Sequence, residues 1–277
     1  MSWSAVARKD FWDAIRSRLI IGIAGLFVVF IALGAGIGVA LGYGGDGVRL
    51  IMTLLLSAAG VLVPLIAIGV SYRAIAGERD TGTLKILLSL PNSRADVIIG
   101  KFLGRSAVVS VAVLVGFLFG LISFAAAAEG DIQIGTYLGF TFTTLLLGIV
   151  FVSIAVSVSA FTASTFRSGI GSFGLFIIFW QLWGWFVFLL RYVANGFEMP
   201  GLFEEPPDWA QFVDFLSPIT AYNESTAWLF NQLLDQETER IPLEPYGLEG
   251  WFGFVVIAVW IALPLAIGYL RFESSDL

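Results

Sequence analysis

Long runs of apolar residues, each about the length of a membrane-spanning helix, dominate the hydrophobic pattern of this chain. Crossing about 30 Å of hydrocarbon at about 1.5 Å per residue takes about 20 residues. Six segments reach this length, and the only charged residue in any of them is Arg191, at the end of one. They are residues 19–43, 50–72, 106–128, 137–163, 169–192 and 251–270. The pattern therefore predicts an all-α membrane protein with six transmembrane helices in a single domain, residues 1–277.

Residues 1–18 mix apolar and charged positions at helical spacing. The apolar positions are Trp3, Val6 or Ala7, Phe11 and Ile15, while Arg8, Arg16 and Arg18 can face lipid headgroups. The alternative is a charged stub that only sets topology. Because large aromatic residues are costly in a solvated tail, we favour an N-terminal interfacial helix on the membrane surface.

Two connections are longer than a simple turn requires. Residues 73–105 contain Leu84, Leu87 and Leu88, which form an apolar stripe at helical spacing before Pro91. This predicts a short amphipathic helix, which can dock in the groove of a partner or pack on its own bundle. Ser93-x-x-Asp96 resembles a capping box that starts the next helix. The other long connection, residues 193–250, is rich in acids and predicts short outer helices that fold back before the last span.

The distribution of basic residues predicts the orientation. Twelve of the 15 Lys and Arg residues fall on one side of the predicted membrane. They are Arg8, Lys9, Arg16, Arg18, Arg73, Arg79, Lys85, Arg94, Lys101, Arg105, Arg167 and Arg271. Arg49, Arg191 and Arg240 fall on the other. We therefore expect a multi-pass protein of the cell membrane with both termini in the cytoplasm and residues 193–250 outside.

The composition excludes several kinds of chemistry. Hydrophobic residues make up 58% of the 277 residues and charged residues 13%, and the mean hydropathy is +0.89. The chain has no His and no Cys, which removes the usual proton shuttle, the thiolate nucleophile and the commonest metal ligands, so we expect no metal site. An intramembrane hydrolase is thereby disfavoured. The net charge of −6, with only three Lys, gives no sign of nucleic-acid binding.

Three polar residues stand out inside the predicted spans. Ser153 and Ser157 lie one turn apart and can line a polar pathway, bond to their own helix or join neighbouring helices. Gln181 is the most polar group well inside a span, and we expect its amide to be buried and bonded across the bundle, with a substrate contact as the alternative. No span carries an ionisable residue near its middle, which disfavours an ion-coupled secondary transporter, the alternative function that we consider.

The segment from Glu78 to Leu84, Glu-Arg-Asp-Thr-Gly-Thr-Leu, continues through Leu88-Ser-Leu-Pro91 to Ser93-Arg94 and Gly100-Lys101. It resembles the E-x-x-x-G-T-L…L…P…GK loop of ABC-2 type permeases. The stretch from Arg8 to Arg18 is similar to the family's N-terminal elbow helix, and Leu216-Ser-Pro218…Tyr222 resembles a stretch before its last span. The likeness covers essentially the whole chain and includes permeases of the copper and nitrous-oxide reductase maturation type.

The resemblance implies a transporter subunit whose loop is a coupling helix that seats in a cytoplasmic ATPase. The residues it assigns to this element are Glu78, Arg79, Asp80, Gly82, Thr83, Leu84, Leu87, Leu88 and Pro91. It also implies a second permease subunit, as a homodimer or heterodimer, and contact with membrane lipid. Residues 95–102 lack the first Gly and the Ser or Thr of a P-loop, so we expect no cofactor on this chain, with ATP and magnesium in the partner. Export or copper-enzyme maturation is the expected role, with the substrate left open.

Overall fold

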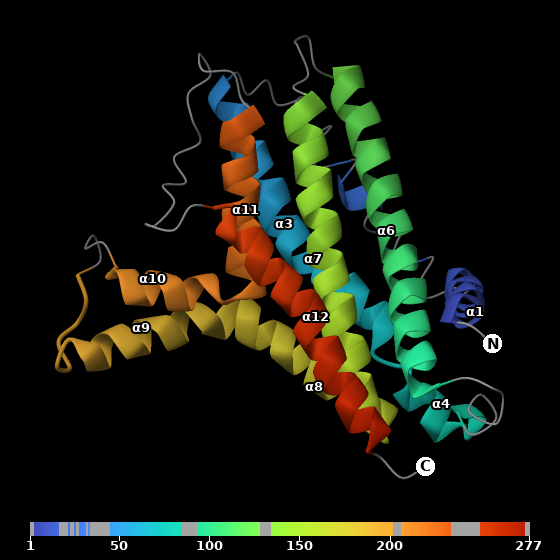
Figure 1. Cartoon of the computed structure of the whole chain (residues 1–277). Coiled ribbons are helices and arrows are strands. Elements are labelled where there is room, and N and C mark those ends of the chain that lie inside the picture. Colours follow the sequence, from blue (N-terminus) through green and yellow to red (C-terminus); the bar gives the residue numbers. More distant parts are fainter. Residues whose placement is uncertain are drawn as a thin grey trace.

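A computed structural model describes residues 3–16, 22, 25, 28–31, 33, 45–84, 93–127, 134–201, 206–233 and 250–274. This described part is helical and contains no strand (Figure 1). The elements are α1 (Trp3–Ile15), α3 (Gly45–Ser71), α4 (Ala76–Asp80), α6 (Arg94–Ala127), α7 (Ile134–Phe161), α8 (Thr165–Ile177), the π-helical turn η1 (Ile178–Leu182), α9 (Trp183–Ala194), α10 (Asp208–Phe215), α11 (Pro218–Leu233) and α12 (Phe252–Glu273).

Five helical segments of the described chain are long and apolar enough to cross a membrane. They are Leu56–Asp80, Arg94–Ile122, Ile134–Phe161, Thr165–Ala194 and Phe252–Glu273. Each overlaps one of the six predicted spans, so the all-helical class is confirmed. The first predicted span, residues 19–43, lies mostly outside the described residues.

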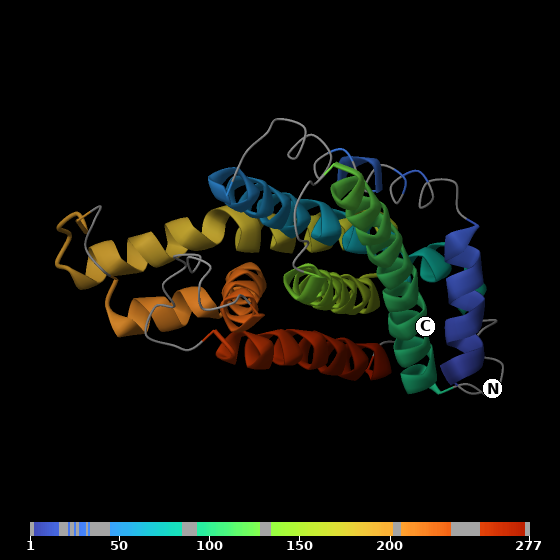
Figure 2. The same ribbon diagram turned by 90° about the horizontal axis from the view of Figure 1, so that it is seen from above.

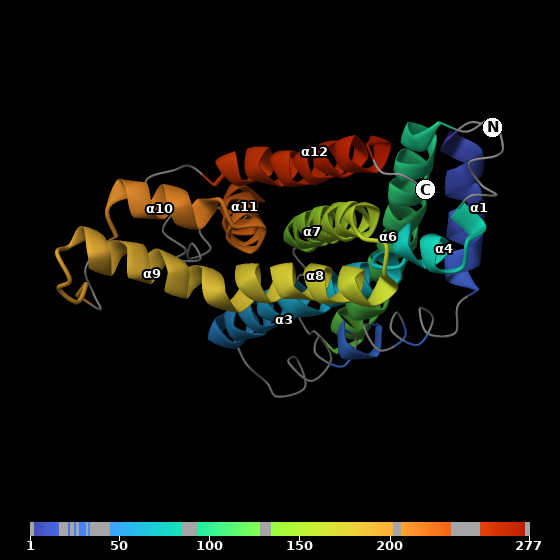
Figure 3. The ribbon, with the colours of Figure 1, turned by 90° about the horizontal axis from the view of Figure 1, so that it is seen from below.

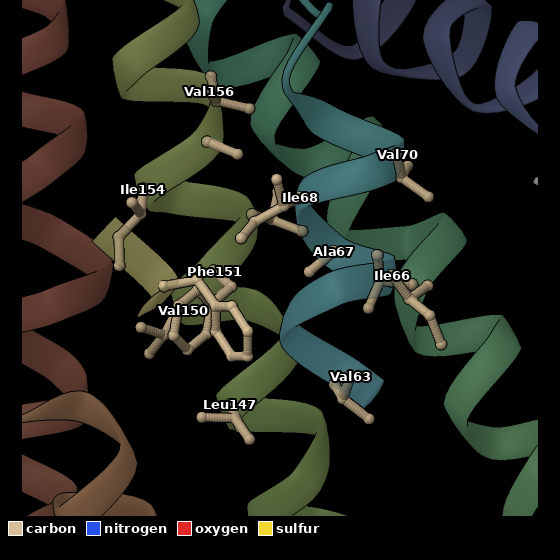
Figure 4. Packing of buried hydrophobic residues seen from close by; sticks show 14 of the residues in the cluster. Val63, Ile66, Ala67, Ile68, Val70, Leu147, Val150, Phe151, Ile154 and Val156 are labelled. Atoms are coloured by element: carbon tan, nitrogen blue, oxygen red, sulfur yellow. The ribbon is translucent and has the colours of Figure 1, made fainter. Parts of the chain in front are cut away.

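Helix α7 forms the centre of the bundle. It contacts α3, α6, α8, α11 and α12, which surround it in Figures 1 and 2. Figure 4 shows Ile68 of α3 pointing toward the segment of α7 that carries Phe151, and both side chains are fully buried. Because other helices surround the middle of α7, its buried positions from Thr143 to Ala160 run around the whole helix, whereas Leu138 and Phe142 nearer its beginning are exposed.

The outer helix α11 folds back along α7, as the sequence predicts for the segment before the last span. The Tyr222 hydroxyl lies 3.2 Å from that of Thr144, and Thr226 donates to Thr143 at 2.9 Å. All four residues are buried. Hydroxyl pairs of this kind satisfy polar groups that would otherwise be unpaired in an apolar interior, so they fix α11 against α7.

Helix α1 packs across the beginning of α6, where two glycines lie one turn apart (Figure 3). A Cβ at Gly100 would lie 2.6 Å from Val6 Cβ, and one at Gly104 would lie 2.8 Å from the Ala7 carbonyl oxygen. Only glycine allows this close approach. The buried face of α1 is Val6, Asp10 and Ala14, whereas Trp3 is exposed. A helix over Trp3–Ile15 is therefore present, with Val6 of the expected apolar positions packed against α6, and its placement on the membrane surface stays a prediction.

The predicted capping box at the start of α6 is confirmed. The Ser93 hydroxyl accepts the backbone N–H of Asp96 at 3.0 Å, and Asp96 Oδ2 accepts the backbone N–H of Ser93 at 3.0 Å. Asp96 Oδ1 also accepts the backbone N–H of Trp3 at 3.1 Å. The cap therefore satisfies free donors of α6 and ties the start of α1 to it.

Candidate coupling site

The turn between α3 and α4 is fixed to the end of α7 and the start of α8. The Ser159 hydroxyl accepts the backbone N–H groups of Ile75 and Ala76 at 3.0 and 2.9 Å. The Ser168 hydroxyl donates to the Tyr72 carbonyl at 2.6 Å. Free N–H groups at the start of a helix need such partners, and here the neighbouring helix α7 supplies one. The short helix α4 is therefore held firmly by its own bundle.

Lys101 joins α4 to α1 from its position on α6. Its ammonium nitrogen lies 2.8 Å from Glu78 Oε1 and 3.4 Å from Asp10 Oδ1. The Lys101 side chain is 2% exposed and that of Asp10 7%. An ammonium group so deeply buried is costly without carboxylate partners, and these two carboxylates come from different helices.

Arg105 completes this cluster one turn further along α6. Its guanidinium Nε lies 2.6 Å from Asp10 Oδ2, and another nitrogen donates to Asp10 Oδ1 at 3.0 Å. Arg105 also donates to the Val70 carbonyl near the end of α3 at 2.9 Å. The cluster of Asp10, Glu78, Lys101 and Arg105, here called the charge cluster, thus connects α1, α3, α4 and α6.

The two residues after Glu78 bond to the connection between α7 and α8 and to the start of α8. Arg79 donates to the Thr162 carbonyl at 3.2 Å and lies over the ring of Phe272, 5.3 Å from its centroid. Asp80 Oδ2 accepts the Thr165 backbone N–H at 2.9 Å and also the Thr165 hydroxyl. Ser164, the N-cap residue of α8, makes no capping hydrogen bond with its own side chain. Asp80 supplies an acceptor for the start of α8 instead.

Arg94 approaches the same aromatic ring of α12 from α6. Its guanidinium carbon lies 5.4 Å from the centroid of the Phe272 ring, and it donates to the carbonyls of Phe272 and, at 2.9 Å, Glu273. Cation–π contacts and charge-assisted bonds at a helix C-terminus are both favourable. The last turn of α12 is therefore linked to α4 and to α6.

The turn after α4 is exposed. Gly82 has a φ of +72°, a left-handed conformation that side chains disfavour. The Thr81 hydroxyl donates to the Gly77 carbonyl at 3.0 Å and lies 2.9 Å from the hydroxyl of Thr83. Residues 80–83 thus form the exposed tip of this segment.

Leucine positions of the predicted coupling helix have different environments. Leu84 is 1% exposed and packs within the chain's own hydrophobic cluster, so this leucine does not face a partner groove in the isolated chain. Leu87, Leu88 and Pro91 lie outside the described residues. The helical residues of this segment also differ from the prediction: α4 covers Ala76–Asp80, and a turn at 81–82 separates it from helical residues 83–84.

The polar residues of the spans fall into two groups. Ser153 donates to the Ile261 carbonyl at 2.7 Å and Ser157 to the Pro264 carbonyl at 2.5 Å, so both join α7 to α12. Gln181 lies in the π-helical turn η1 and is exposed on the surface of the isolated chain. The expectation of a buried Gln181 amide bonded across its own bundle is therefore wrong. The segment η1 lies on a span that contacts the bundle on one side only, which hydropathy alone does not reveal.

The sequence analysis did not predict that Asp10, Lys101 and Arg105 form one cluster. An acid in the middle of the apolar stripe of residues 1–18 was one available signal. Another was the spacing of Gly100 and Gly104 around Lys101, since two glycines one turn apart mark a close helix crossing. Neither signal says which helix crosses there, and that pairing decides which charges meet.

The described chain thus carries helices that can cross a membrane several times, and most of its charged interactions lie at one end of the bundle. These features define a multi-pass membrane protein. The sequence profile described as ABC-2 family transporter protein matches residues 4–277. The chain belongs to this family, and is therefore a membrane permease subunit of an ABC transporter, which works together with an ATPase subunit.

Two relatives carry the name probable ABC transporter permease protein NosY. The chain is 31% identical over 202 residues to that of Pseudomonas aeruginosa, covering 71% of this chain and 74% of the relative. It is 35% identical over 162 residues to that of Stutzerimonas stutzeri, covering 56% of this chain and 58% of the relative.

Proposed function

We propose that residues 72–84 receive the movement of the ATPase subunit and pass it to α1 and α6 through Lys101. The observation that carries this proposal is the buried Lys101 side chain, which bonds to Glu78 of α4 and Asp10 of α1. Because a buried charge cannot leave its partners cheaply, a displacement of α4 moves Lys101 and the helices attached to it together. The exposed tip at residues 80–83 is the part that the ATPase contacts first.

ATP hydrolysis takes place in the partner, which holds ATP and magnesium. Lys101, the lysine that follows Gly100, is buried in the charge cluster on a helix and is not presented to a nucleotide. Two permease subunits, as a homodimer or heterodimer, then enclose the pathway. Both termini lie in the cytoplasm, following the distribution of basic residues.

The substrate class follows from the resemblance to permeases of the copper and nitrous-oxide reductase maturation type. We propose export of a compound used outside the cytoplasm, in copper-enzyme maturation or a related role. A chain without His or Cys lacks the commonest ligands for a soft metal, so the compound moved is not a copper ion held by imidazole or thiolate.

A pair of glycine substitutions tests the coupling proposal. Gly82 and Gly196 both have positive φ, +72° and +70°, and both donate a backbone N–H, to Arg79 and Val193 respectively. Proline fixes φ near −65° and removes the donor, so Gly82→Pro and Gly196→Pro impose the same local change at opposite ends of the molecule. We expect Gly82→Pro, alone or with Leu87→Asp, to abolish co-purification of the ATPase and ATP-driven transport in proteoliposomes.

Gly196→Pro serves as the matched control and keeps both activities. Equal behaviour of the two variants would contradict the assignment of residues 72–84 as the coupling element. Transport driven by a proton or sodium gradient without ATP would instead support the ion-coupled alternative.

A further inference from the structure

A cavity of about 170 Å³ lies between α9 and α10, away from the coupling site. Helix α9 lines it with Gly184, Val187, Phe188 and Arg191, and the other wall consists of Pro206, Ala210, Gln211 and Asp214. Figures 1 and 3 show the two helices side by side, at the end of the molecule remote from α1 and α4. At about 30 Å³ per water molecule, the cavity has room for a small polar group but not for a drug-sized ligand.

Arg191 is a basic residue that lines this cavity. Its guanidinium Nε is buried and has no hydrogen-bond partner among the described residues. Asp214 lies on the opposite wall, and burial raises the pKa of its carboxyl more than a side-chain hydrogen bond with Thr220 lowers it. Among the described residues, Arg191 and Asp214 form no ion pair. A buried guanidinium N–H without an acceptor is costly, which makes an anionic ligand favourable at this position.

The surroundings of Arg191 indicate where this ligand comes from. Arg191 lies near the end of the span Thr165–Ala194, at the level where a transmembrane helix meets the headgroups. Large apolar side chains around it are exposed, namely Trp185, Leu189, Val193 and Phe197. Such side chains are favourable in contact with lipid, and an arginine among them reaches toward phosphate.

We propose that this cavity binds the phosphodiester headgroup of a membrane lipid, with the phosphate accepting hydrogen bonds from Arg191 and a headgroup N–H or O–H donating to Asp214. Because an oxygen of Asp214 on the opposite wall can accept a hydrogen bond, a group that also carries a donor is more favourable here than a purely anionic one. Phosphatidylethanolamine has an N–H donor in its headgroup, whereas phosphatidylcholine has none. This pair of lipids therefore separates the contribution of Asp214 from that of Arg191.

Native mass spectrometry of the transporter complex in mild detergent, with each lipid added separately, tests the proposal. We expect wild type to retain phosphatidylethanolamine about fivefold better than phosphatidylcholine, and Asp214→Asn to bring the two to near equality. Arg191→Gln is expected to lower retention of both lipids by about tenfold or more. Arg191→Lys keeps the charge without the planar guanidinium, and its lipid retention is expected to lie between those of wild type and Arg191→Gln. It replaces Arg191→Gln if that variant does not fold. Arg167→Gln, an exposed arginine of the same span, is the control and leaves retention unchanged.

Three results would overturn the proposal. One is equal lipid retention by wild type and both Arg191 variants. Another is competition by soluble glycerophosphoethanolamine at concentrations as low as those of the lipid, which would assign the cavity to a free phosphate ester. The third concerns Glu204 and Glu205, which directly precede Pro206 in the sequence. If wild type retained no lipid and a double variant Glu204→Gln, Glu205→Gln did, these two acids would be the natural partners of Arg191.

Discussion

The ammonium group of Lys101 lies 2.8 Å from a carboxylate oxygen of Glu78, and this contact joins α6 to α4 inside the bundle. Removing one member of a buried pair leaves the other charge uncompensated, which costs about 3–5 kcal/mol in measured cases. We expect a smaller loss for Glu78→Gln, about 1–3 kcal/mol, because Asp10 still faces Lys101. Thermal unfolding of the purified permease measures this loss. The exposed Asp13→Asn on α1 is the control and leaves the unfolding temperature unchanged.

The same pair also predicts a double-mutant result. Replacing both charges by Glu78→Gln and Lys101→Met removes the desolvation cost together with the attraction. The double variant is then expected to be less destabilised than the sum of the two single variants. Additive losses would show that Glu78 and Lys101 do not interact. ATP-driven transport of a double variant that folds is expected to remain low, because α4 has lost its link to α6.

A side chain at Gly100 is expected to displace α1. A Cβ there would meet the Trp3 carbonyl oxygen at 2.8 Å as well as Val6, and backbone cannot rotate out of the way as a side chain can. Gly100→Ala is therefore expected to destabilise the protein by about 1–3 kcal/mol and to increase proteolytic cleavage of the N-terminal helix. Gly174→Ala in α8 is the matched control, since a Cβ there meets nothing within 4 Å. A helical Gly→Ala change without a clash is neutral or slightly stabilising.

Ser153 and Ser157 are expected to support packing rather than substrate passage. Each donates to a carbonyl of α12, and interhelical hydrogen bonds in membranes are worth about 0.6 kcal/mol on average. Ser153→Ala with Ser157→Ala should lower the unfolding temperature slightly and leave the KM for the transported compound unchanged. A change in KM at unchanged stability would show instead that these hydroxyls line the pathway.

Stability is expected to depend on pH through Glu224 of α11. Burial, followed by the neighbouring Asp214, raises the pKa of Glu224 to about 7. A carboxyl with a raised pKa binds more protons in the folded state, so stability falls as pH rises from about 4.3, the unfolded value, to about 7. Glu224→Gln should therefore unfold at a higher temperature than wild type at pH 8 and at a similar temperature at pH 4. Glu198→Gln, which changes an exposed acid, is the control and should unfold at the same temperature as wild type at pH 8. If Glu198→Gln raised the unfolding temperature at pH 8 as much as Glu224→Gln, the pH dependence would not arise from Glu224.

The hydrophobic pattern by itself determined the class of protein. Uninterrupted apolar runs can be satisfied only as spanning helices, because lipid offers no partner for backbone N–H and C=O groups. Local rules also predicted the capping box of Ser93 and Asp96, whose partners are three residues apart. The loop from Glu78 to Pro91 carried the family resemblance, since its residues are contiguous in the sequence.

Only the tertiary structure decided which charges and polar groups meet. Asp10 and Lys101 come together because α1 crosses α6 at Gly100 and Gly104, and no local pattern specifies a crossing between helices so distant in sequence. Leu84 has the spacing of a surface stripe, yet the turn at Gly82 places it in the core. Gln181 was expected inside the bundle, but its helix contacts the other helices on one side only. Sequence periodicity fixes which residues share a helix face, whereas the neighbours of that face depend on packing across the whole bundle.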